Sequence, residues 1–454
     1  MNRRSTRRDF LRQTAVAGAA GPLLAGQTVA HAQEDKSKSP NERVQFACIG
    51  VGGKGDSDTR DAGAYGDIVA LCDIDEKTLD KMAEKFPKAK KYTDYRKMLE
   101  EVGDKIDAVT VSTPDHSHAP ASVRAMRLGK HTFCQKPLTW SVEEARLMRT
   151  LAAEKKLVTQ MGNQGTSHNG FRSGVELIRS GVLGPIREIH VWTNRPIWPQ
   201  GVSRPTDTPG IPDNVHWYEF LGPAHDRPYS PKYHPFNWRG WLDFGTGALG
   251  DMACHTINVA AMALSLFDPE SVEVVDTSGI VDKESYPVWS IIKTNFGERE
   301  GRAPLSLTWY DGGSKLPEEK RAYKKLLEGQ NVGGSGLLLV GEKGSFYSVN
   351  DYGAEHILLP NDKFADLKAP EPTLPRTKNH FGEWVEGIKE NDPKKPMSNF
   401  DYAGRLTETV LLGVVALRSG GKIEWDPAAM RVKNNSDADQ YIRRDYRKGF
   451  SIHE

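Results

Sequence analysis

The sequence predicts an α/β protein in which a doubly wound parallel sheet is followed by a domain with an open, mostly antiparallel sheet. Three observations lead to this fold class. Apolar runs alternate with helical stretches in residues 43–163, the first of these runs ends in glycines, and strand-like runs follow one another from residue 270 onward. Parallel strands need helical crossovers, whereas antiparallel strands can be joined directly. We therefore expect two domains, residues 43–163 and 164–454.

Five apolar runs of the first domain are typical of buried parallel strands. They are RVQFACIGVGG (43–53), DIVALCDID (67–75), the start of IDAVTVSTPDHSHAP (106–120), HTFCQKP (131–137) and LVTQMGNQ (157–164). Helical spacing follows three of them, and the helix at 141–156 begins with a capping box of Ser141 and Glu144. The first crossover, KGDSDTRDAGAYG, is too polar and glycine-rich for an ideal helix.

A glycine motif stands where the first strand meets this crossover. Gly50, Gly52 and Gly55 form G-x-G-x-x-G, which lets backbone N–H groups approach a pyrophosphate. Asp73 ends the second strand, where a carboxylate would hold a ribose hydroxyl and repel the 2′-phosphate of NADP. The Asp73 carboxylate favours NAD over NADP, although Lys77 lies nearby. The motif and Asp73 together favour a dinucleotide site over a plain glycine turn. The residues predicted to contact the cofactor here are Gly50, Val51, Gly52, Gly55 and Asp73.

The loops after the third and fourth strands are expected at the same edge of the sheet, where ligands of such folds bind. They carry the further cofactor candidates Thr113, Pro114, His118, Gln135 and Lys136. The peptide bond before Pro137 is a candidate for the cis form. His116 is better explained as a buried structural residue, whereas His118 is equally compatible with cofactor contact and with capping the next helix.

The N-terminal residues resemble an export signal. Residues 1–32 combine a basic start, an apolar stretch rich in Ala and Gly, and a small-residue cleavage pattern, AHA. The Arg7–Arg8 pair is similar to twin-arginine signals, whose translocase carries folded proteins. Residues 33–42 are a polar linker. We expect a periplasmic or otherwise exported protein; the alternative is a basic tail without a role in export.

Composition excludes several other classes. The net charge is +1 and no basic stripe is interleaved with aromatic residues, so we expect no nucleic-acid partner. Beyond the N-terminus no apolar run is long enough for a bilayer, so no stable membrane anchor is expected. The four cysteines lack zinc spacing, and no metal site is predicted.

A long insert in the second domain is a candidate substrate wall. Residues 197–245 are dense in proline, glycine and aromatic side chains, and irregular segments of this length are usually functional. Trp238 and Arg239 are the candidates for sugar contact, although any single ring of the insert is better explained by packing. Helices are predicted at 380–390 and 400–421.

Taken together, these segments resemble the Gfo/Idh/MocA oxidoreductase family. The resemblance runs from about Arg43 to the C-terminus, and WRGWLDFGTGALGDMACHTIN is its most specific part. It implies an N-terminal Rossmann domain, a C-terminal α/β domain whose open sheet often packs in homo-oligomers, and NAD(P)-dependent chemistry at hydroxyl groups of sugars or cyclitols.

The resemblance also assigns catalytic roles. It places Lys136 between nicotinamide and substrate, and Asp251 and His255 at the family's acid and histidine positions. Their i, i+4 spacing puts both on one helical face. His255 would take the hydroxyl proton, Lys136 would hold the developing alkoxide, and Asp251 would orient the imidazole. The alternative is a helix cap at Asp251 and a buried structural His255.

Two positions depart from the family pattern. Gln135 stands where glutamate is usual, and Asn258 where many members have aspartate. Neither is the expected proton acceptor, but both leave the substrate and the division of acid–base work open.

An exported enzyme cannot depend on free cofactor, so we expect a small carbohydrate substrate and tightly bound NAD. The leading hypothesis is a sugar, glycoside or cyclitol oxidoreductase. The second is a redox-neutral glycosidase or lyase that works by oxidation, elimination, hydration and reduction. The third is a non-catalytic, NAD-containing carbohydrate-binding protein.

Overall fold

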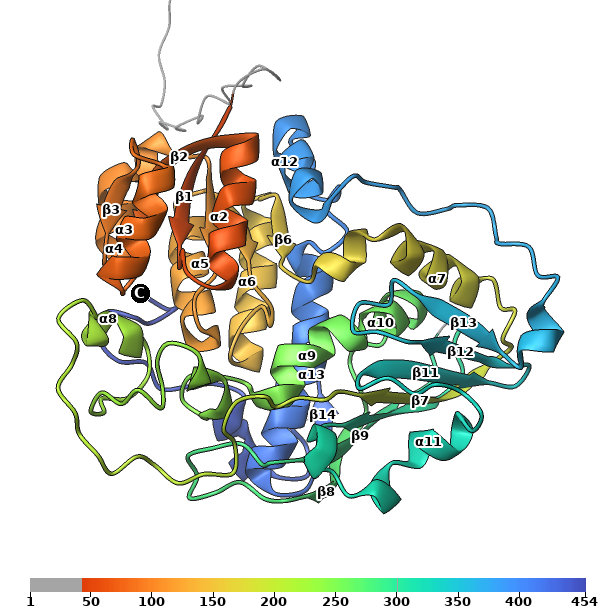
Figure 1. Cartoon of the computed structure of the whole chain (residues 1–454). Coiled ribbons are helices and arrows are strands. Elements are labelled where there is room, and N and C mark those ends of the chain that lie inside the picture. The colour runs from red at the N-terminus through yellow and green to blue at the C-terminus, as the bar shows by residue number, and fades with distance from the viewer. Residues whose placement is uncertain (1–42, 300) are drawn as a thin grey trace, which may run out of the picture. The chain divides into compact units, whose positions relative to one another are not determined.

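The computed structural model describes residues 43–299 and 301–454 (Figure 1). The predicted signal segment, 1–32, and the linker, 33–42, lie outside the described residues, so they stay predictions.

The first sheet is parallel throughout and has six strands in the order β3-β2-β1-β4-β5-β6. The strands are β1 (Val44–Ile49), β2 (Gly66–Cys72), β3 (Lys90–Tyr92), β4 (Ala108–Val111), β5 (His131–Cys134) and β6 (Thr159–Met161). The helices between them are α2 (Lys54–Tyr65), α3 (Glu76–Lys85), α4 (Tyr95–Val102), α5 (His118–Arg127) and α6 (Val142–Glu154). This strand order confirms the predicted Rossmann sheet.

Local features of this domain agree with the sequence in two places and differ in one. The capping box of Ser141 and Glu144 is present at the start of α6, and the Lys136–Pro137 peptide bond is cis. The polar crossover forms a regular helix, α2, contrary to our expectation. Its buried face consists of small and polar residues, Gly55, Asp58, Thr59 and Ala62.

The second sheet has nine strands in the order β13-β12-β11-β7-β10-β9-β8-β14-β15. Its pairs are antiparallel except β7 with β10, which confirms the mostly antiparallel sheet. The strands are β7 (Ile186–Trp192), β8 (Ser271–Thr277), β9 (Ser290–Phe296), β10 (Leu305–Tyr310), β11 (Gly336–Gly341), β12 (Ser345–Ser348), β13 (His356–Leu359), β14 (Lys422–Asp426) and β15 (Arg431–Val432).

Helices cover one face of this sheet, and a short layer of the same chain covers part of the other. The inner face packs on α7 (Asn169–Arg179), α9 (Gly247–Thr256), α10 (Asn258–Leu264) and α13 (Phe400–Ser419). On the outer face, Tyr323 of α11 (Ala322–Leu326) stacks on Trp192 at 4.3 Å between ring centroids. The expected homo-oligomer stays a prediction.

One helix from the second half of the sequence completes the core of the first domain. α12 (His380–Glu390) lies beside α2 and β1 (Figure 1). Its Trp384 is fully buried, packs on Phe46 and Phe133, and donates its indole N–H to the Val158 carbonyl at 3.0 Å. The two halves of the chain therefore share one hydrophobic cluster.

Among the residues that the structure describes, none of the helices has the combination of length and apolar character that a bilayer crossing requires. The four cysteines, Cys48, Cys72, Cys134 and Cys254, are buried free thiols.

Candidate active site

The glycine motif forms a cradle that side chains would fill. A Cβ on Gly55 would lie 1.9 Å from the Gly50 carbonyl oxygen, and one on Gly52 would lie 2.7 Å from Cγ2 of Thr78. Gly50 itself has a φ of 76°, which disfavours other residues. The loop therefore depends on glycine at all three positions, as close approach of backbone N–H groups to a pyrophosphate requires.

Asp73 is held directly against this loop. Its Oδ2 accepts a hydrogen bond from the Val51 N–H at 2.9 Å, and its Oδ1 accepts one from the Asp75 N–H at 3.0 Å. Burial raises the pKa of Asp73, and these backbone donors oppose the rise. The carboxylate at the end of β2 thus lies where a ribose of a bound dinucleotide is expected, so these residues fit such a group.

A cavity of about 430 Å³ opens beside the loop between α2 and α3. Its charged lining is mostly basic, with Arg60 and Lys85 both paired to Asp56 at 2.6 and 3.0 Å, and Lys81 nearby. This lining gives the cradle a positive surrounding, which suits a phosphate-bearing ligand.

His118 ties the two loops that follow β4 and β5. Its ring nitrogens lie 2.8 Å from the Thr113 carbonyl and 2.7 Å from the Pro137 carbonyl, and the side chain is buried. The residue makes no side-chain cap to α5, which begins at this position. His118 thus fixes the turn that carries Thr113 and Pro114 relative to the turn that carries Lys136.

Lys136 and Asp251 join the two domains in a partly buried ion pair. The Lys136 ammonium donates to Oδ1 and to the backbone carbonyl of Asp251, both at 2.8 Å. The Nε of Arg239 lies 3.4 Å from the same Oδ1. Burial acts to raise the pKa of Asp251, but Lys136 and Arg239 hold it below its usual range. The carboxylate is therefore ionised, and the site is rich in fixed positive charge.

His255 lies one helical turn beyond Asp251 on α9 and is also buried. Its Nδ1 has no hydrogen-bond partner within the described residues, and the ring of Tyr352 packs edge-on at 5.1 Å. Burial, aided by the Lys136 charge, lowers the pKa of His255 to about 3. The imidazole is therefore neutral at ordinary pH and able to accept a proton.

Two further residues of this site were not identified from the sequence. Asp115, in the loop after β4, accepts a hydrogen bond from the Thr246 hydroxyl at 2.6 Å. Burial raises the pKa of Asp115 to about 7, with Lys136, Asp251 and Arg239 among the charges that act on it. Tyr352 comes from the turn between β12 and β13. His116 and His118, which follow Asp115 in the sequence, indicated that this loop could be functional. Nothing in the sequence pointed to Tyr352.

His116 and Asp115 together seat the start of α9. The His116 ring lies 2.8 Å from the Phe220 carbonyl and 3.2 Å from the Phe244 carbonyl, and its backbone N–H also donates to Phe244. Thr246, bonded to Asp115, is the N-cap residue of α9. The loop after β4 therefore sets the position of the helix that carries Asp251 and His255.

Most rings of the predicted substrate wall pack on one another. The cluster consists of Trp217, Phe220, Leu221, Ala224, Tyr233, Trp238, Trp241 and Phe244. Trp238 is 7% exposed, and the Arg239 guanidinium lies 4.3 Å from its ring. Arg239 contacts the Lys136–Asp251 pair, whereas the Trp238 ring packs against the Arg239 guanidinium.

The two departures from the family pattern have structural explanations. Asn258 donates to the Thr166 hydroxyl at 2.8 Å and accepts from the Tyr402 hydroxyl at 2.6 Å, which uses both ends of its amide. Gln135 donates to Asp58 at 2.8 Å, a bond that an ionised glutamate could not make.

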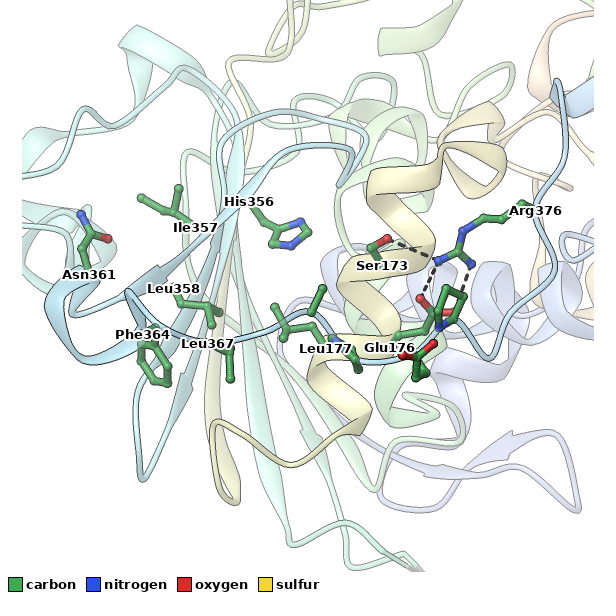
Figure 2. A pocket seen from close by; sticks show the side chains of 14 residues that line it. Ser173, Glu176, Leu177, His356, Ile357, Leu358, Asn361, Phe364, Leu367 and Arg376 are labelled. Carbon is green, nitrogen blue, oxygen red and sulfur yellow. Dashed lines mark hydrogen bonds and ion pairs between the residues drawn. The ribbon is translucent and has the colours of Figure 1, made fainter.

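A second cavity, of about 650 Å³, lies elsewhere in the described chain. It is bounded by α7, β13 and the segment after β13, and none of the predicted site residues lines it (Figure 2). Its rim holds the pair of Glu176 and Arg376 at 2.7 Å. The residues with candidate catalytic chemistry therefore lie away from this cavity.

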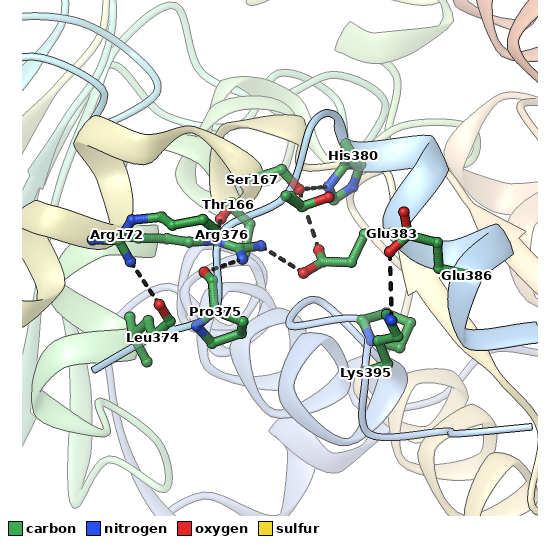
Figure 3. A network of polar contacts seen from close by, with 12 residues as sticks. Thr166, Ser167, Arg172, Leu374, Pro375, Arg376, His380, Glu383, Glu386 and Lys395 are labelled. Carbon is green, nitrogen blue, oxygen red and sulfur yellow. Dashed lines mark hydrogen bonds and ion pairs between the residues drawn. The ribbon is translucent and has the colours of Figure 1, made fainter. Parts of the chain in front are cut away.

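A second polar network fastens α12 to α7 (Figure 3). The fully buried Arg172 pairs with Glu383 at 2.7 Å, and Ser167 lies 2.7 Å from Nδ1 of His380. Burial lowers the pKa of His380 to about 4. Burial raises the pKa of Glu383, and its contact with Arg172 opposes that rise. The role of the network is to hold the chain where it returns to the first domain.

Both domains of the chain are similar to those of known oxidoreductases. Residues 44–163 match the model of an oxidoreductase family with an NAD-binding Rossmann fold, and residues 177–299 match the C-terminal α/β domain of that family. A Glycosyl hydrolase family 109 protein of Solibacter usitatus is 28% identical over 197 residues, and protein 2 of Akkermansia muciniphila is 31% identical over 218. Each alignment covers 40% of this chain, and 44% and 46% of those relatives.

Solved structures share the fold. The WlbA dehydrogenase of Bordetella pertussis, in complex with NADH and UDP-GlcNAcA, superposes with a TM-score of 0.58 at 16% identity over 85% of this chain and 99% of its own. An inositol dehydrogenase homologue of Azotobacter vinelandii, with NADH and myo-inositol, gives 0.56 at 16% identity over 85% and 98%. The two matching models together cover more than half of the chain, which carries both domains of the Gfo/Idh/MocA oxidoreductase family and belongs to it.

Proposed function

We propose that the protein oxidises or reduces a hydroxyl group of a sugar, glycoside or cyclitol with a tightly bound nicotinamide cofactor, NAD rather than NADP. The observation that carries the proposal is the meeting of Lys136, Asp251 and a neutral His255 at the edge of the glycine cradle. The molecules bound in two structures with this fold, myo-inositol and UDP-GlcNAcA, support the substrate class.

The chain's own residues divide the work of carbinol oxidation as follows. When bound, the nicotinamide group supplies the hydride acceptor. His255 takes the hydroxyl proton, because its imidazole is neutral and its Nδ1 is free of protein partners. The Lys136 ammonium stabilises the oxygen that gains negative charge, and Asp251 holds that ammonium in place at 2.8 Å. Arg239 adds a second cation beside the substrate.

The choice of NAD is supported by Asp73. A 2′-phosphate beside this carboxylate would be repelled, whereas two ribose hydroxyls could donate to it. The test is to recover the folded protein without added cofactor, denature it, and quantify the released nucleotides per chain. Near-stoichiometric NAD(H) supports the proposal, NADP(H) would overturn the Asp73 argument, and a nucleotide-free protein would overturn tight binding.

Catalysis is tested with Lys136→Met and His255→Ala. With cofactor still bound, each variant should reduce turnover of an accepted sugar or cyclitol by about 10²–10³-fold, since each removes a group that acts on the reacting oxygen. Absorbance of the reduced cofactor in a single turnover gives the rate. The Lys389→Met variant, at an exposed position of α12, is the control. If both site variants change affinity alone, the protein binds carbohydrate without catalysis.

The second candidate is a redox-neutral glycosidase or lyase, favoured by the relatives named glycosyl hydrolase family 109. In this cycle a sugar hydroxyl is oxidised, the neighbouring C–H loses its proton, the glycosidic substituent leaves, water adds, and the carbonyl is reduced again. The cycle incorporates solvent deuterium at carbon, whereas simple oxidation does not. Mass spectrometry of products formed in D₂O therefore separates the two candidates.

We also propose that the protein is exported folded through the twin-arginine route. Support comes from the order of basic, apolar and small-residue segments in residues 1–32. Cell fractionation of the full chain and of an Arg7→Lys/Arg8→Lys variant tests this, and equal periplasmic recovery of both would overturn it.

A further inference from the structure

A buried carboxylate that the proposed mechanism does not use lies beneath the glycine cradle. Asp58 belongs to the second turn of α2 and is 1% exposed. Ionised carboxylates are rarely buried this deeply unless donors surround them. Its position on the first crossover helix places it close to the ends of β1, β4 and β5.

Three donors from three segments converge on this group. The Ser112 hydroxyl, after β4, donates to Oδ2 at 2.7 Å, and the Gln135 amide, after β5, donates to the same oxygen at 2.8 Å. The ammonium of Lys54, within the glycine motif, contacts Oδ1. Because an ionised carboxylate only accepts hydrogen bonds, this contact also fixes which end of the Gln135 amide faces Asp58.

Gln135 has little freedom to turn away from Asp58. It is 5% exposed, and a Cβ on Gly162 would lie 2.5 Å from its carboxamide carbon. The next residue in the chain is Lys136, joined to Pro137 by a cis peptide bond. The bond between Asp58 and Gln135 thus anchors the turn that presents the catalytic lysine.

Charge explains why glutamine stands at position 135. A glutamate there would put two carboxylates within 2.8 Å of each other, and one of them would have to be protonated. Asp58 and Gln135 therefore form a complementary pair with a single negative charge. In this chain the negative charge of the pair lies on α2 and not on residue 135.

We propose that Asp58 is a further anionic residue of the cofactor site, which positions the Gln135–Lys136 turn and favours an oxidised, cationic nicotinamide over the neutral reduced form. The inference rests on the proposed function. The Lys54 side chain is 45% exposed beside the glycine cradle, so a diphosphate bound there would compete with Asp58 for its ammonium. Diphosphate binding thereby leaves the Asp58 charge less neutralised.

The test measures the affinities of the full chain, first freed of any bound nucleotide and refolded, for NAD⁺ and for NADH by calorimetry and reads their ratio. Asp58→Asn removes the charge and should lower the NAD⁺-to-NADH affinity ratio roughly tenfold, the order expected for a unit charge partly screened by Lys54. Asp61→Asn, an exposed position on the same helix, is the matched control and should leave the ratio unchanged.

The charge-swapped variant separates this role from a merely structural one. Gln135→Glu alone should weaken binding of both forms, because two carboxylates then compete, whereas Asp58→Asn/Gln135→Glu should restore the ratio. An Asp58→Asn ratio equal to the parent's, or no recovery in the double variant, would overturn the inference. Failure of the parent to bind either nucleotide would instead overturn the proposed function.

Discussion

The Asp115→Asn substitution should change how the stability of the protein depends on pH. Asp115 is 3% exposed, and burial raises the pKa of its carboxyl from 3.8 to about 7. The folded state therefore favours the protonated carboxyl. Asparagine mimics that neutral form, and its amide oxygen can still accept the hydrogen bond from the Thr246 hydroxyl.

The magnitude follows from the two pKa values. A carboxyl whose folded pKa is raised contributes full stability below its unfolded pKa and loses it as the pH rises through the folded pKa. The difference between an unfolded pKa of 3.8 and a folded pKa of about 7 corresponds to a total loss of roughly 4 kcal/mol in the free energy of unfolding. Roughly 2–3 kcal/mol of it falls between pH 5 and pH 8. Asp115→Asn should therefore be more stable than the parent at pH 8, and the advantage should shrink toward pH 5.

Urea unfolding of both proteins at half-unit pH steps from 5 to 8.5 measures this difference. Asp104→Asn, at an exposed carboxylate, is the control and should follow the parent at every pH. Thr246→Val removes the donor that opposes the raised pKa, so its pH-dependent loss should be larger than the parent's. Parallel stability curves for the parent and Asp115→Asn would refute the reasoning.

Three further substitutions test other parts of the structure. Gly55→Ala places a methyl carbon 1.9 Å from the Gly50 carbonyl oxygen and should abolish NAD binding in calorimetry; retained affinity would contradict the cradle. Trp384→Ala empties a fully buried site between three phenylalanine rings and should lower the free energy of unfolding by about 3–5 kcal/mol in urea, against less than 1 kcal/mol if α12 were loosely attached. Tyr352→Ala removes the ring at 5.1 Å from His255 and should raise KM more than it lowers kcat in steady-state kinetics, whereas Tyr352→Phe should retain the parent's KM.

Local sequence signals were sufficient for the architecture of the first domain. The glycine motif, the capping box and the cis Pro137 each depend on residues close together in the chain, and all three are present in the structure. β3 was not identified, because the Lys90–Tyr92 strand exposes two lysines and has no apolar run. α4 was also missed, although Met98, Leu99 and Val102 form a buried apolar face on it. α2 was underestimated because its buried face is made of small and polar residues.

The candidate site was predictable only where a motif pointed to it. Lys136, Asp251 and His255 stand at positions that the resemblance assigns, and the structure brings them together. Asp58 lies in a polar crossover, where a carboxylate is ordinarily solvated, and its burial depends on Ser112 and Gln135 from other strands. Contacts between residues this far apart in the chain cannot be predicted from the local sequence pattern.

Because α12 packs on the first domain, the core of that domain cannot be completed until residues 380–390 have been synthesised. The six strands of the Rossmann sheet leave the ribosome before Trp384 exists, so the apolar surface of Phe46 and Phe133 has no cover. At about 5–20 residues per second, the interval between residue 163 and α12 lasts on the order of 10–40 s. During that time the nascent domain presents aromatic side chains to any chaperone that binds them. The first domain to be translated is thus among the last parts of the chain to have its hydrophobic core completed.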